Sequence, residues 1–307
     1  MVTRTGMIGF SEGNGHPFSF SAIINGFDRD GFNRSGWPVI LEYLDKQPKE
    51  MFGIGDAKVT CAWTQKPDIT TRLCAACGID MAVDHPSDML GQIDALIIAR
   101  DDWKSHAALA MPFLQSGIPV FVDKPLSLDP SELRDFWPYL CSGLLMSTSG
   151  MRYAIELDQI VARMDDIGDI RFVSAAVLND IEKYGIHMLD AVASIGLKRP
   201  VLMSRADTAH QSYDIQYENG VVLRLDCLGA VAKTFHLNVY GSAGNVRVEL
   251  ANNFMAFRRT LQHFFKMVDE RIPPIEPDSL LGTMNLIRQA QAMSPSEMME
   301  VSNAKSF

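Results

Sequence analysis

The chain has 307 residues, of which 47 % are hydrophobic and 21 % charged, so its composition is that of a globular protein and excludes a disordered, collagenous or coiled-coil chain. The formal net charge of −9 argues against nucleic acid and against an anionic membrane surface as partners. No apolar run approaches the roughly 18 residues that cross a bilayer, and no signal-peptide pattern precedes the first strand-like run. We therefore expect a cytoplasmic protein, and the length predicts about two domains.

The five cysteines are odd in number and scattered, which does not indicate a disulfide framework. Cys74 and Cys77 form a C-x-x-C pair within a helix-compatible segment. A zinc site would need a second pair or suitably spaced histidines, and the sequence offers neither. We predict no metal site, and thiols of this kind fit a cytoplasmic location.

The first half alternates β-rich and helix-compatible segments. Such alternation predicts βαβ units, a parallel sheet and a doubly wound fold. Between the first helix and the second strand lies a long segment, about residues 28–56, that reads either as a surface insertion or as a lid or partner surface. The expected strands are residues 5–10, 57–64, 93–99, 118–122 and 144–149, and the expected helices are residues 17–27, 68–77, 104–115 and 131–140.

The pattern changes near residue 150. Turns of hairpin type at residues 218–220 and 241–244 separate β-rich runs and predict a mainly antiparallel sheet. We expect two domains, one over residues 1–150 and the other over residues 151–307. The strands expected in the second half are residues 170–178, 201–206, 213–217, 221–228, 234–240 and 245–250, and the helices are residues 151–164, 187–195, 254–269 and 279–293.

A glycine-rich turn, residues 9–16, joins the first strand to the first helix. Backbone N–H groups in such a turn can approach a pyrophosphate, although Ser11 replaces the second glycine of the G-x-G-x-x-G pattern. The second strand is not followed by the acid that binds the ribose of NAD. Lys66 stands nearby and could face a 2′-phosphate, so the choice between NAD and NADP stays open.

Two further stretches carry reactive side chains. The strand at residues 118–122 ends in Asp123-Lys124-Pro125, and Lys124 can donate to a substrate hydroxyl at the edge where ligands bind. His187 can accept a hydroxyl proton, and Asp190, three residues later, can orient its imidazole. A solvated lysine and an ordinary hydrogen-bonded histidine are the alternative interpretations.

These stretches resemble hallmarks of the Gfo/Idh/MocA oxidoreductases. Asp123-Lys124-Pro125-Leu126 is similar to that family's Glu-Lys-Pro-Leu, and Gly185, His187 and Asp190 match its Gly-x-His-x-x-Asp. The resemblance implies that residues 1–150 form a dinucleotide-binding Rossmann domain. It implies that residues 151–307 form a substrate-binding and oligomerisation domain with a large, open, mainly antiparallel sheet. It also implies a substrate between Lys124 and His187, and a homo-oligomer, a dimer or tetramer, packed through the sheet.

The resemblance and the local patterns together assign the candidate site. We expect Lys124, His187 and Asp190 to be catalytic. NAD or NADP is expected to be bound by Gly9, Ser11, Gly13, Asn14, Gly15, His16, Thr64, Lys66, Arg100, His106, Asp123, Lys124 and Pro125. The substrate is expected to be bound by Lys124, Arg152, Tyr153, Lys183, Tyr184 and His187.

The predicted activity is hydride transfer between a nicotinamide cofactor and a hydroxyl or carbonyl carbon of a sugar, cyclitol or sugar derivative. Lys183 stands where the family often has an aspartate, four residues before the histidine, and a lysine there would lower the basicity of His187. Tyr184 or Asp180 could substitute for that acid. The alternatives are a non-catalytic cofactor- or sugar-binding regulator and a lyase or glycosidase that recycles bound NAD.

Overall fold

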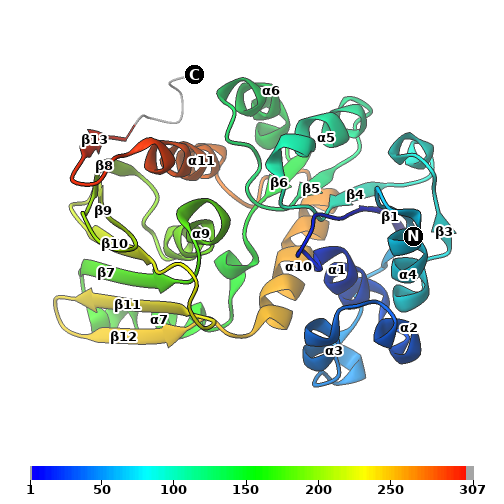
Figure 1. Cartoon of the computed structure of the whole chain (residues 1–307), viewed down its shortest axis with the longest axis horizontal. Helices are drawn as coiled ribbons and strands as arrows, with labels where there is room; N and C mark the ends of the chain where they lie inside the picture. Colours follow the sequence, from blue (N-terminus) through cyan, green and yellow to red (C-terminus); the bar gives the residue numbers. More distant parts are fainter. Residues whose placement is uncertain (1, 302–307) are drawn as a thin grey trace. The chain divides into compact units, whose positions relative to one another are not determined.

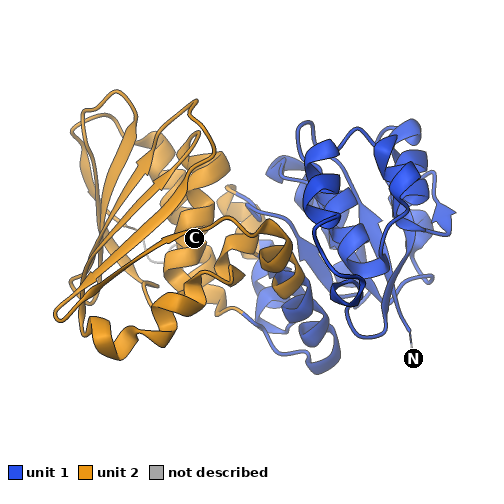
Figure 2. Cartoon of the chain, turned by 90° about the horizontal axis from the view of Figure 1, so that it is seen from below, with its two compact units in different colours: residues 1–127, 135–147, 260–274 blue, residues 128–134, 148–259, 275–307 orange. Residues whose placement is uncertain are grey.

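The computed structural model describes residues 2–301, which form two compact units (Figure 2). Of these residues, unit 1 comprises 2–127, 135–147 and 260–274, and unit 2 comprises 128–134, 148–259 and 275–301. Both units are discontinuous in sequence. The functional division into domains 1–150 and 151–307 stays a prediction.

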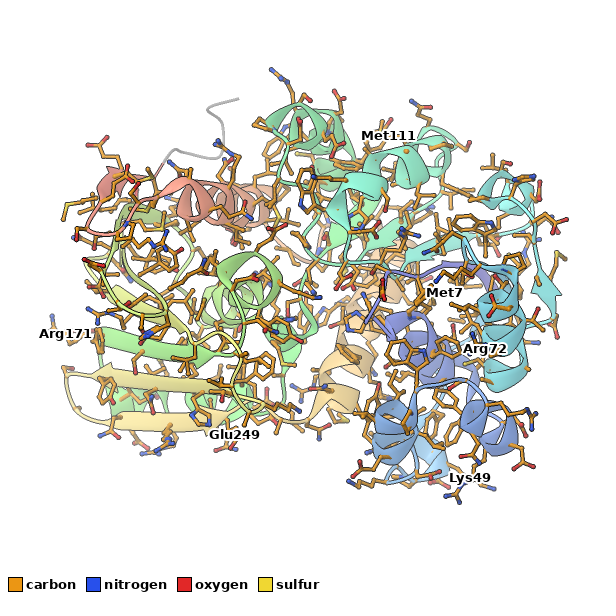
Figure 3. The ribbon with its side chains drawn as sticks, in the orientation of Figure 1. Met7, Lys49, Arg72, Met111, Arg171 and Glu249 are labelled. Carbon is orange, nitrogen blue, oxygen red and sulfur yellow. The ribbon has the colours of Figure 1, made fainter. Side chains whose placement is uncertain are left out.

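Unit 1 is built on a six-stranded parallel sheet with the order β3-β2-β1-β4-β5-β6 (Figure 1). The central strands β4 and β5 are wholly apolar and buried, as a sheet covered on both faces requires. The last four residues of β1 are also buried, among them Met7, which is labelled in Figure 3. The strands are β1 (Thr3–Ile8), β2 (Ala57–Trp63), β3 (Met81–Ala82), β4 (Ala95–Ile98), β5 (Val120–Val122) and β6 (Leu145–Ser147). The predicted doubly wound sheet is confirmed, and the two-residue strand β3 is too short to leave a sequence signal.

Helices connect these parallel strands. Helices α1 and α4 contact β2, whereas α5 contacts β4 and β5. Gly78 ends α4 in the left-handed conformation with φ 58°, which is the usual reason for glycine at that position. The helices are α1 (His16–Asn25), α4 (Pro67–Cys77), α5 (His106–Gln115) and α6 (Pro130–Cys141), with 3-10 turns η2 (Pro86–Met89) and η3 (Trp103–Ser105).

The segment at residues 28–56 is largely helical. It contains α2 (Arg29–Asn33), α3 (Pro38–Leu44) and the 3-10 turn η1 (Lys49–Met51), which lie beside α1 in Figure 1. Phe18 of α1 contacts the rings of Phe32 and Trp37, with centroids 6.1 and 6.3 Å apart. The segment therefore covers the outer side of the first helix with apolar side chains.

Unit 2 contains a seven-stranded sheet with the order β12-β11-β7-β10-β9-β8-β13. The two predicted hairpins are present as the antiparallel pairs β9–β10 and β11–β12, and one internal pair, β7–β10, is parallel. The mainly antiparallel sheet is thus confirmed. The strands are β7 (Ile170–Val177), β8 (Pro200–Arg205), β9 (Gln211–Tyr217), β10 (Val222–Cys227), β11 (Phe235–Gly241), β12 (Asn245–Glu249) and the unpredicted edge strand β13 (Met298–Glu300).

Three predicted helices are present in the second half, and one prediction is wrong. Residues 151–164 form no continuous helix, because Ser149 caps a 3-10 turn and the Glu156 carboxylate accepts the N–H groups of Ala251 and Asn252, which fixes the chain between short turns. The elements observed there are η4 (Gly150–Tyr153), α7 (Leu157–Ala162) and α8 (Met164–Ile167). The remaining helices are the π-helix η5 (Ile181–Gly185), α9 (Ile186–Ser194), α10 (Asn253–Glu270) and α11 (Pro277–Ala292). Within residues 2–301, no helix is both long and apolar enough to cross a membrane.

Candidate functional site

The strand order of unit 1 reverses between β1 and β4, which is the switch point of a doubly wound sheet. Ligands of such sheets bind outside the carboxyl ends of the strands at this point. The loops that follow β1, β4 and β5 meet there, and they carry the side chains Ser11, Asn14, His16, Asp101, Asp123 and Lys124, which we call the switch-point cluster.

The turn after β1 offers unused backbone donors. Gly13 has φ 78° and no atom within 4 Å of the position of a Cβ, so the space beside it is open. Among residues 2–301, no acceptor lies within hydrogen-bond distance of the N–H groups of Gly13 and Gly15, although Gly15 is buried. The N–H of His16 is taken by the Asn14 side chain at 2.8 Å, and Pro17 has none. The turn rather than the helix therefore supplies donors, and these fit the pyrophosphate of a dinucleotide.

Asp123 organises the first half of the cluster. Its carboxylate accepts hydrogen bonds from Asn14 Nδ2 at 3.1 Å, from His16 Nδ1 at 2.6 Å and from the Lys124 N–H at 2.9 Å. Burial by itself raises the pKa of Asp123, but the nearby His16 and Lys124 outweigh it and lower the pKa to about 2. Asp123 is therefore ionised at neutral pH and ties the β5 loop to the glycine-rich turn.

Ser11, Asp101 and Lys124 form the second half of the cluster. The Ser11 hydroxyl donates to Asp101 Oδ1 and accepts the Asp101 N–H at 3.1 Å. Lys124 is only 4 % exposed, and its Nζ lies 3.8 Å from Asp101 Oδ2. The serine at the second glycine position thus binds the β4 loop, and the buried lysine is held by a carboxylate. Pro125 follows it through a cis peptide bond.

The residues after β2 occupy two different environments. Thr64 is buried, and its hydroxyl bonds Thr70 and the Lys66 carbonyl at 2.8 and 2.7 Å, so it stabilises the start of α4. Lys66 is exposed, and its ammonium lies 5.7 Å from the centroid of the Phe10 ring, beside the glycine-rich turn. The Thr64 hydroxyl is therefore occupied within the protein, whereas the Lys66 ammonium lies beside the turn.

Two further predicted ligands hold loops. Arg100 bonds Asp102 at 2.8 and 2.6 Å and Gln65 at 2.9 Å, and the Gln65 amide pairs with the backbone of Phe10 beside Gly9. His106 is fully buried, with one ring nitrogen 3.0 Å from the Leu126 carbonyl and the other 3.0 Å from the Arg100 carbonyl. Burial lowers the pKa of His106. Arg100 and His106 therefore position the loops at the switch point.

In unit 2, Thr148, Ser149, Arg152, His187 and Asp190 form a second group, which we call the histidine cluster. His187 Nδ1 lies 2.6 Å from the Ser149 hydroxyl. Asp190 accepts the Ser149 N–H at 2.6 Å and the Thr148 hydroxyl at 3.0 Å. The predicted support of His187 by Asp190 thus runs through Ser149, and no bond between the two side chains is seen.

Asp190 also binds the arginine of the predicted substrate site. Arg152 is 9 % exposed, and its Nη1 lies 3.3 Å from Asp190 Oδ1. Burial raises the pKa of Asp190, and Arg152 opposes that rise. Burial also raises the pKa of Tyr153 to about 12, so its hydroxyl stays protonated. Arg152 and Asp190 thus belong to a buried polar network that reaches His187 through Ser149.

The residues before His187 lie on the π-helix η5, a form of helix that is frequent at functional sites. The rings of Tyr184 and Phe235 both pack edge-on against the His187 ring. Their centroids lie 5.5 Å and 5.6 Å from the His187 centroid, respectively. Lys183 is exposed, and its N–H bonds Asp180, which caps η5. Of the two suggested substitutes for the missing acid, only Tyr184 is seen in contact with His187.

The sequence interpretation missed Gln65, Asp101, Ser149 and Phe235. Position was the available signal for the first three, because each follows a strand at its carboxyl end. Phe235 lies in a predicted strand, but the pairing of that strand with β7 follows only from the tertiary structure. Within residues 2–301, no three potential metal ligands gather in one place. A surface pocket of unit 2 near Lys198, Arg199 and Glu276 lies beyond the end of α9 remote from His187 and contains none of the predicted site residues.

Comparisons with known proteins agree with this geometry. Residues 31–140 match the model of the Gfo/Idh/MocA family, described as an oxidoreductase family with an NAD-binding Rossmann fold. None of the curated proteins compared with the chain is similar enough in sequence to count as a relative.

Solved structures resemble nearly the whole chain. They include myo-inositol 2-dehydrogenase from Lactobacillus plantarum (17 % identity, TM-score 0.75, 98 % of this chain and 100 % of that one). Two others share 14 % identity and cover 98 % of this chain: myo-inositol dehydrogenase from Corynebacterium glutamicum (TM-score 0.75, 99 % of that chain) and scyllo-inositol dehydrogenase from Lactobacillus casei with bound NAD(H) and scyllo-inositol (TM-score 0.74, 99 % of that chain). Residues 31–140 are thus similar in sequence to the Gfo/Idh/MocA oxidoreductases, and the chain has the fold of the solved inositol dehydrogenase structures over nearly its full length.

Proposed function

We propose that the chain is an NAD(P)-dependent dehydrogenase or reductase that acts on a hydroxyl or carbonyl carbon of a sugar, cyclitol or sugar derivative. The observation that supports it most is the glycine-rich turn at the switch point, where Gly13 and Gly15 have free N–H groups and open space adjoins Gly13. A buried lysine follows the neighbouring strand β5. Phosphate donors beside a preorganised cation suit a dinucleotide cofactor and an oxygen that gains charge during the reaction.

In this proposal His187 accepts the proton of the reacting hydroxyl during oxidation and returns it during reduction. When bound, the nicotinamide supplies or accepts the hydride. Lys124 donates a hydrogen bond to the substrate oxygen and stabilises its negative charge. Arg152 and Tyr153 position the substrate's other hydroxyls, and Asp190 holds Arg152 and the Ser149 backbone. Lys66, the cation beside the turn, decides between NAD and NADP by its affinity for a 2′-phosphate.

Calorimetric titration with NAD, NADH, NADP and NADPH tests cofactor binding. We expect one oxidised and reduced pair to bind in the micromolar range. Gly13→Ala should weaken binding at least about tenfold, because the methyl group enters the phosphate space and φ 78° disfavours alanine. Gly26→Ala is the matched control: φ is 80°, no atom lies within 4 Å of its Cβ, and it ends the same helix. Equal loss in both variants would show a folding effect, and no binding of any cofactor would contradict the proposal.

Turnover tests the proposed role of Lys124. Lys124→Ala should lower kcat by at least about a hundredfold while cofactor affinity is retained, since that is the usual scale for a positioned proton-exchanging or charge-stabilising group. Lys104→Ala, at an exposed lysine of η3, should leave kcat unchanged. A panel of polyols and the corresponding ketones, read by nicotinamide absorbance, provides the assay.

A non-catalytic binder is the second candidate. It is favoured by the Asp101–Lys124 contact, which holds the lysine in an ion pair, and by Lys183 in place of an acid. Such a protein would bind cofactor or sugar with no turnover of any polyol. A measured rate that depends on Lys124 rejects this candidate.

We also propose that the sheet of unit 2 mediates a homo-oligomer. Phe172 and Tyr240 are 36 % and 44 % exposed on β7 and β11, and their rings lie 5.9 Å apart. Phe172→Asp should shift the mass measured by light scattering towards the monomer, because a charge would replace an apolar contact. An unchanged mass would contradict the assignment of this face. The cytoplasmic location stays a prediction.

A further inference from the structure

Unit 2 has a pocket at the end of α9 that the proposed function does not use. Its volume is about 330 Å³, at the lower end of the range for pockets that hold small molecules. Its lining residues come from three segments, and we call it the α9 pocket. They lie within residues 196–199 in the loop after α9, within residues 217–219 at the β9–β10 turn, and at Glu276 before α11.

Two ion pairs connect the walls of the α9 pocket. Lys198 Nζ lies 3.0 Å from Glu276 Oε1, and Arg199 Nη1 lies 3.3 Å from Glu218 Oε2. The two positive charges balance the two negative ones. An anion in the pocket would be repelled by the glutamates, and a cation would be repelled by Lys198 and Arg199. These charges therefore favour an uncharged ligand.

Tyr217 brings a hydroxyl without a partner to the α9 pocket. Tyr217 is the last residue of β9, is 4 % exposed, and lines the pocket. Within residues 2–301, no group lies within hydrogen-bond distance of its hydroxyl, and burial raises the pKa of Tyr217 with no hydrogen bond to oppose the rise. The oxygen is not sealed inside the protein, so it is accessible from the pocket. Because the hydroxyl of a buried tyrosine usually has a partner, this one is available to a ligand.

The loops around Tyr217 offer further donors and open space. Asn219 Oδ1 accepts the Val221 N–H at 3.2 Å, which leaves the Asn219 amide N–H groups without an acceptor among residues 2–301. The backbone N–H of Lys198 also has no acceptor in this part of the chain. Gly196 has φ 108° and no atom within 4 Å of the position of a Cβ, so the pocket is open beside it. The α9 pocket thus combines free donors with the carboxylate acceptors of its two ion pairs.

We propose that the α9 pocket binds a neutral polyhydroxylated molecule, a monosaccharide or a cyclitol. A hydroxyl carries both a donor and acceptor lone pairs on one atom. It can therefore donate to Glu218 or Glu276 and accept from Asn219, Lys198 or Tyr217 without adding a charge. The volume of about 330 Å³ suits a single ring better than a chain of sugars.

The α9 pocket is separate from the candidate active site. His187 is the second residue of α9, whereas Gly196 follows the last residue of that helix. A helix of nine residues is about 13 Å long, so one ring cannot contact both places. Binding in the α9 pocket involves neither the cofactor nor the switch-point cluster, and the inference therefore does not rest on the proposed function.

The experiment titrates the full chain, labelled with nitrogen-15 and free of cofactor, with myo-inositol and separately with glucose. Proton–nitrogen correlation spectra follow the Gly196 N–H and the Asn219 side-chain amide, which is assigned by its loss in Asn219→Ser. We expect both signals to shift saturably, with a dissociation constant in the millimolar range that is usual for a small polar ligand. No saturable shift with either compound would overturn the proposal, and so would shifts confined to the surroundings of His187.

Two tyrosine variants on the same strand test the contribution of the hydroxyl. Tyr217→Phe should weaken polyol binding at least about fivefold but should not lower the midpoint of thermal unfolding, because its hydroxyl has no partner in the protein to lose. Tyr213→Phe is the matched control, since Tyr213 is fully buried and its hydroxyl donates to the Ala290 carbonyl at 3.2 Å. This control should lower the midpoint and leave the affinity unchanged. Unchanged affinity in Tyr217→Phe, or equal losses in both variants, would overturn the proposal; if Tyr217→Phe does not fold, the wild-type titration decides.

Charged probes test the class of ligand. Inorganic phosphate and ethylammonium, added at constant ionic strength, should not shift the Gly196 and Asn219 signals saturably, because each meets two like charges in the pocket. Saturation by phosphate without saturation by a polyol would show an anion site and overturn the proposal. The titrations need no turnover, so a chain without dehydrogenase activity can still show this site, and an active enzyme can lack it.

Discussion

At the scale of single residues, buried carboxylates stabilise the loops of both clusters. Asp123 accepts three hydrogen bonds, two of them from the glycine-rich turn, and Asp190 accepts three from residues 148–152. Removing such an acceptor leaves several buried donors without partners, which costs more than an exposed ion pair contributes. Stability measurements can therefore detect each cluster without an enzymatic assay.

Asp123 gives a pH signature. Its pKa falls from near 4 in an unfolded chain to about 2 in the fold, so its stabilisation, about 2 kcal/mol, is fully present above pH 4 and is lost as the pH falls towards 2. Between pH 7 and pH 3, the free energy of unfolding of the wild type should therefore fall about 1 kcal/mol more than that of Asp123→Asn, measured by urea unfolding. If the free energies of unfolding of the two proteins depended on pH in the same way, the partners of Asp123 would not stabilise its ionised form.

Asp190→Ala tests the histidine cluster. The substitution leaves the Arg152 guanidinium, the Thr148 hydroxyl and the Ser149 N–H buried without their carboxylate. We expect the free energy of unfolding to fall by about 3–5 kcal/mol in urea titrations. Glu42→Ala, which breaks the exposed Glu42–Lys46 pair, should produce no measurable change. Similar small effects from both variants would show that the buried pair contributes no more than the exposed one.

At the scale of elements, the inserted helices explain a glycine of the phosphate turn. A Cβ on Gly15 would lie 2.5 Å from Ile40 Cδ1 of α3 and 2.7 Å from the Trp37 ring. Gly15 is therefore required by the close approach of α3, in addition to any ligand. The segment at residues 28–56 thereby supports the first helix and the turn, which favours the interpretation of a packed insertion over that of a lid.

Two glycine-to-alanine substitutions should have opposite effects. Gly15→Ala should lower the free energy of unfolding by about 1–3 kcal/mol through overpacking, and Ile40→Val in the same chain should recover part of it. Gly282→Ala, inside α11 with no atom within 4 Å of its Cβ, should raise the free energy of unfolding by about 1 kcal/mol through helix propensity. Thermal or urea unfolding of the variants measures both, and a stabilising Gly15→Ala would contradict the packing.

At the scale of the whole molecule, unit 1 depends on a segment far away in sequence. Residues 260–274 belong to unit 1, where Phe264 of α10 packs on Phe121 of β5 with ring centroids 5.8 Å apart. Both rings are almost completely buried. The backbone at Arg271 also approaches Gly143 so closely that a Cβ there would lie 2.5 Å away. The parallel sheet is therefore completed late in the chain.

A fragment of residues 1–147 should be less stable than the same fragment joined to residues 260–274 by a flexible linker. Without that segment Phe121 is exposed, and the fragment should bind a hydrophobic dye and unfold at lower urea. Circular dichroism and dye fluorescence compare the two fragments. Identical unfolding curves would show that residues 260–274 are not part of the folding unit.

The amino-acid sequence alone predicts the two sheets, their hairpins and the family resemblance. Buried parallel strands such as β4 and β5 consist of apolar runs, and turns such as residues 218–220 are encoded within a few residues. It failed at residues 151–164, where local helix periodicity is overridden by hydrogen bonds to Glu156 and Ser149, and at β3 and β13, which are too short to have a periodic signal.

The contacts between the candidate residues could not be predicted from the sequence. His187 and Asp190 are close in sequence, but they are connected through Ser149, which lies 38 residues before His187 in the chain. The Ser149 N–H donates to Asp190, and the Ser149 hydroxyl contacts His187 Nδ1. Asp123 meets His16, and Asp101 meets Ser11 and Lys124, across loops of neighbouring strands. Residue types and spacing identify which side chains can react, because those are local properties. Hydrogen bonds and ion pairs depend on atoms that only folding brings within 3 or 4 Å, so they follow from the three-dimensional contacts alone.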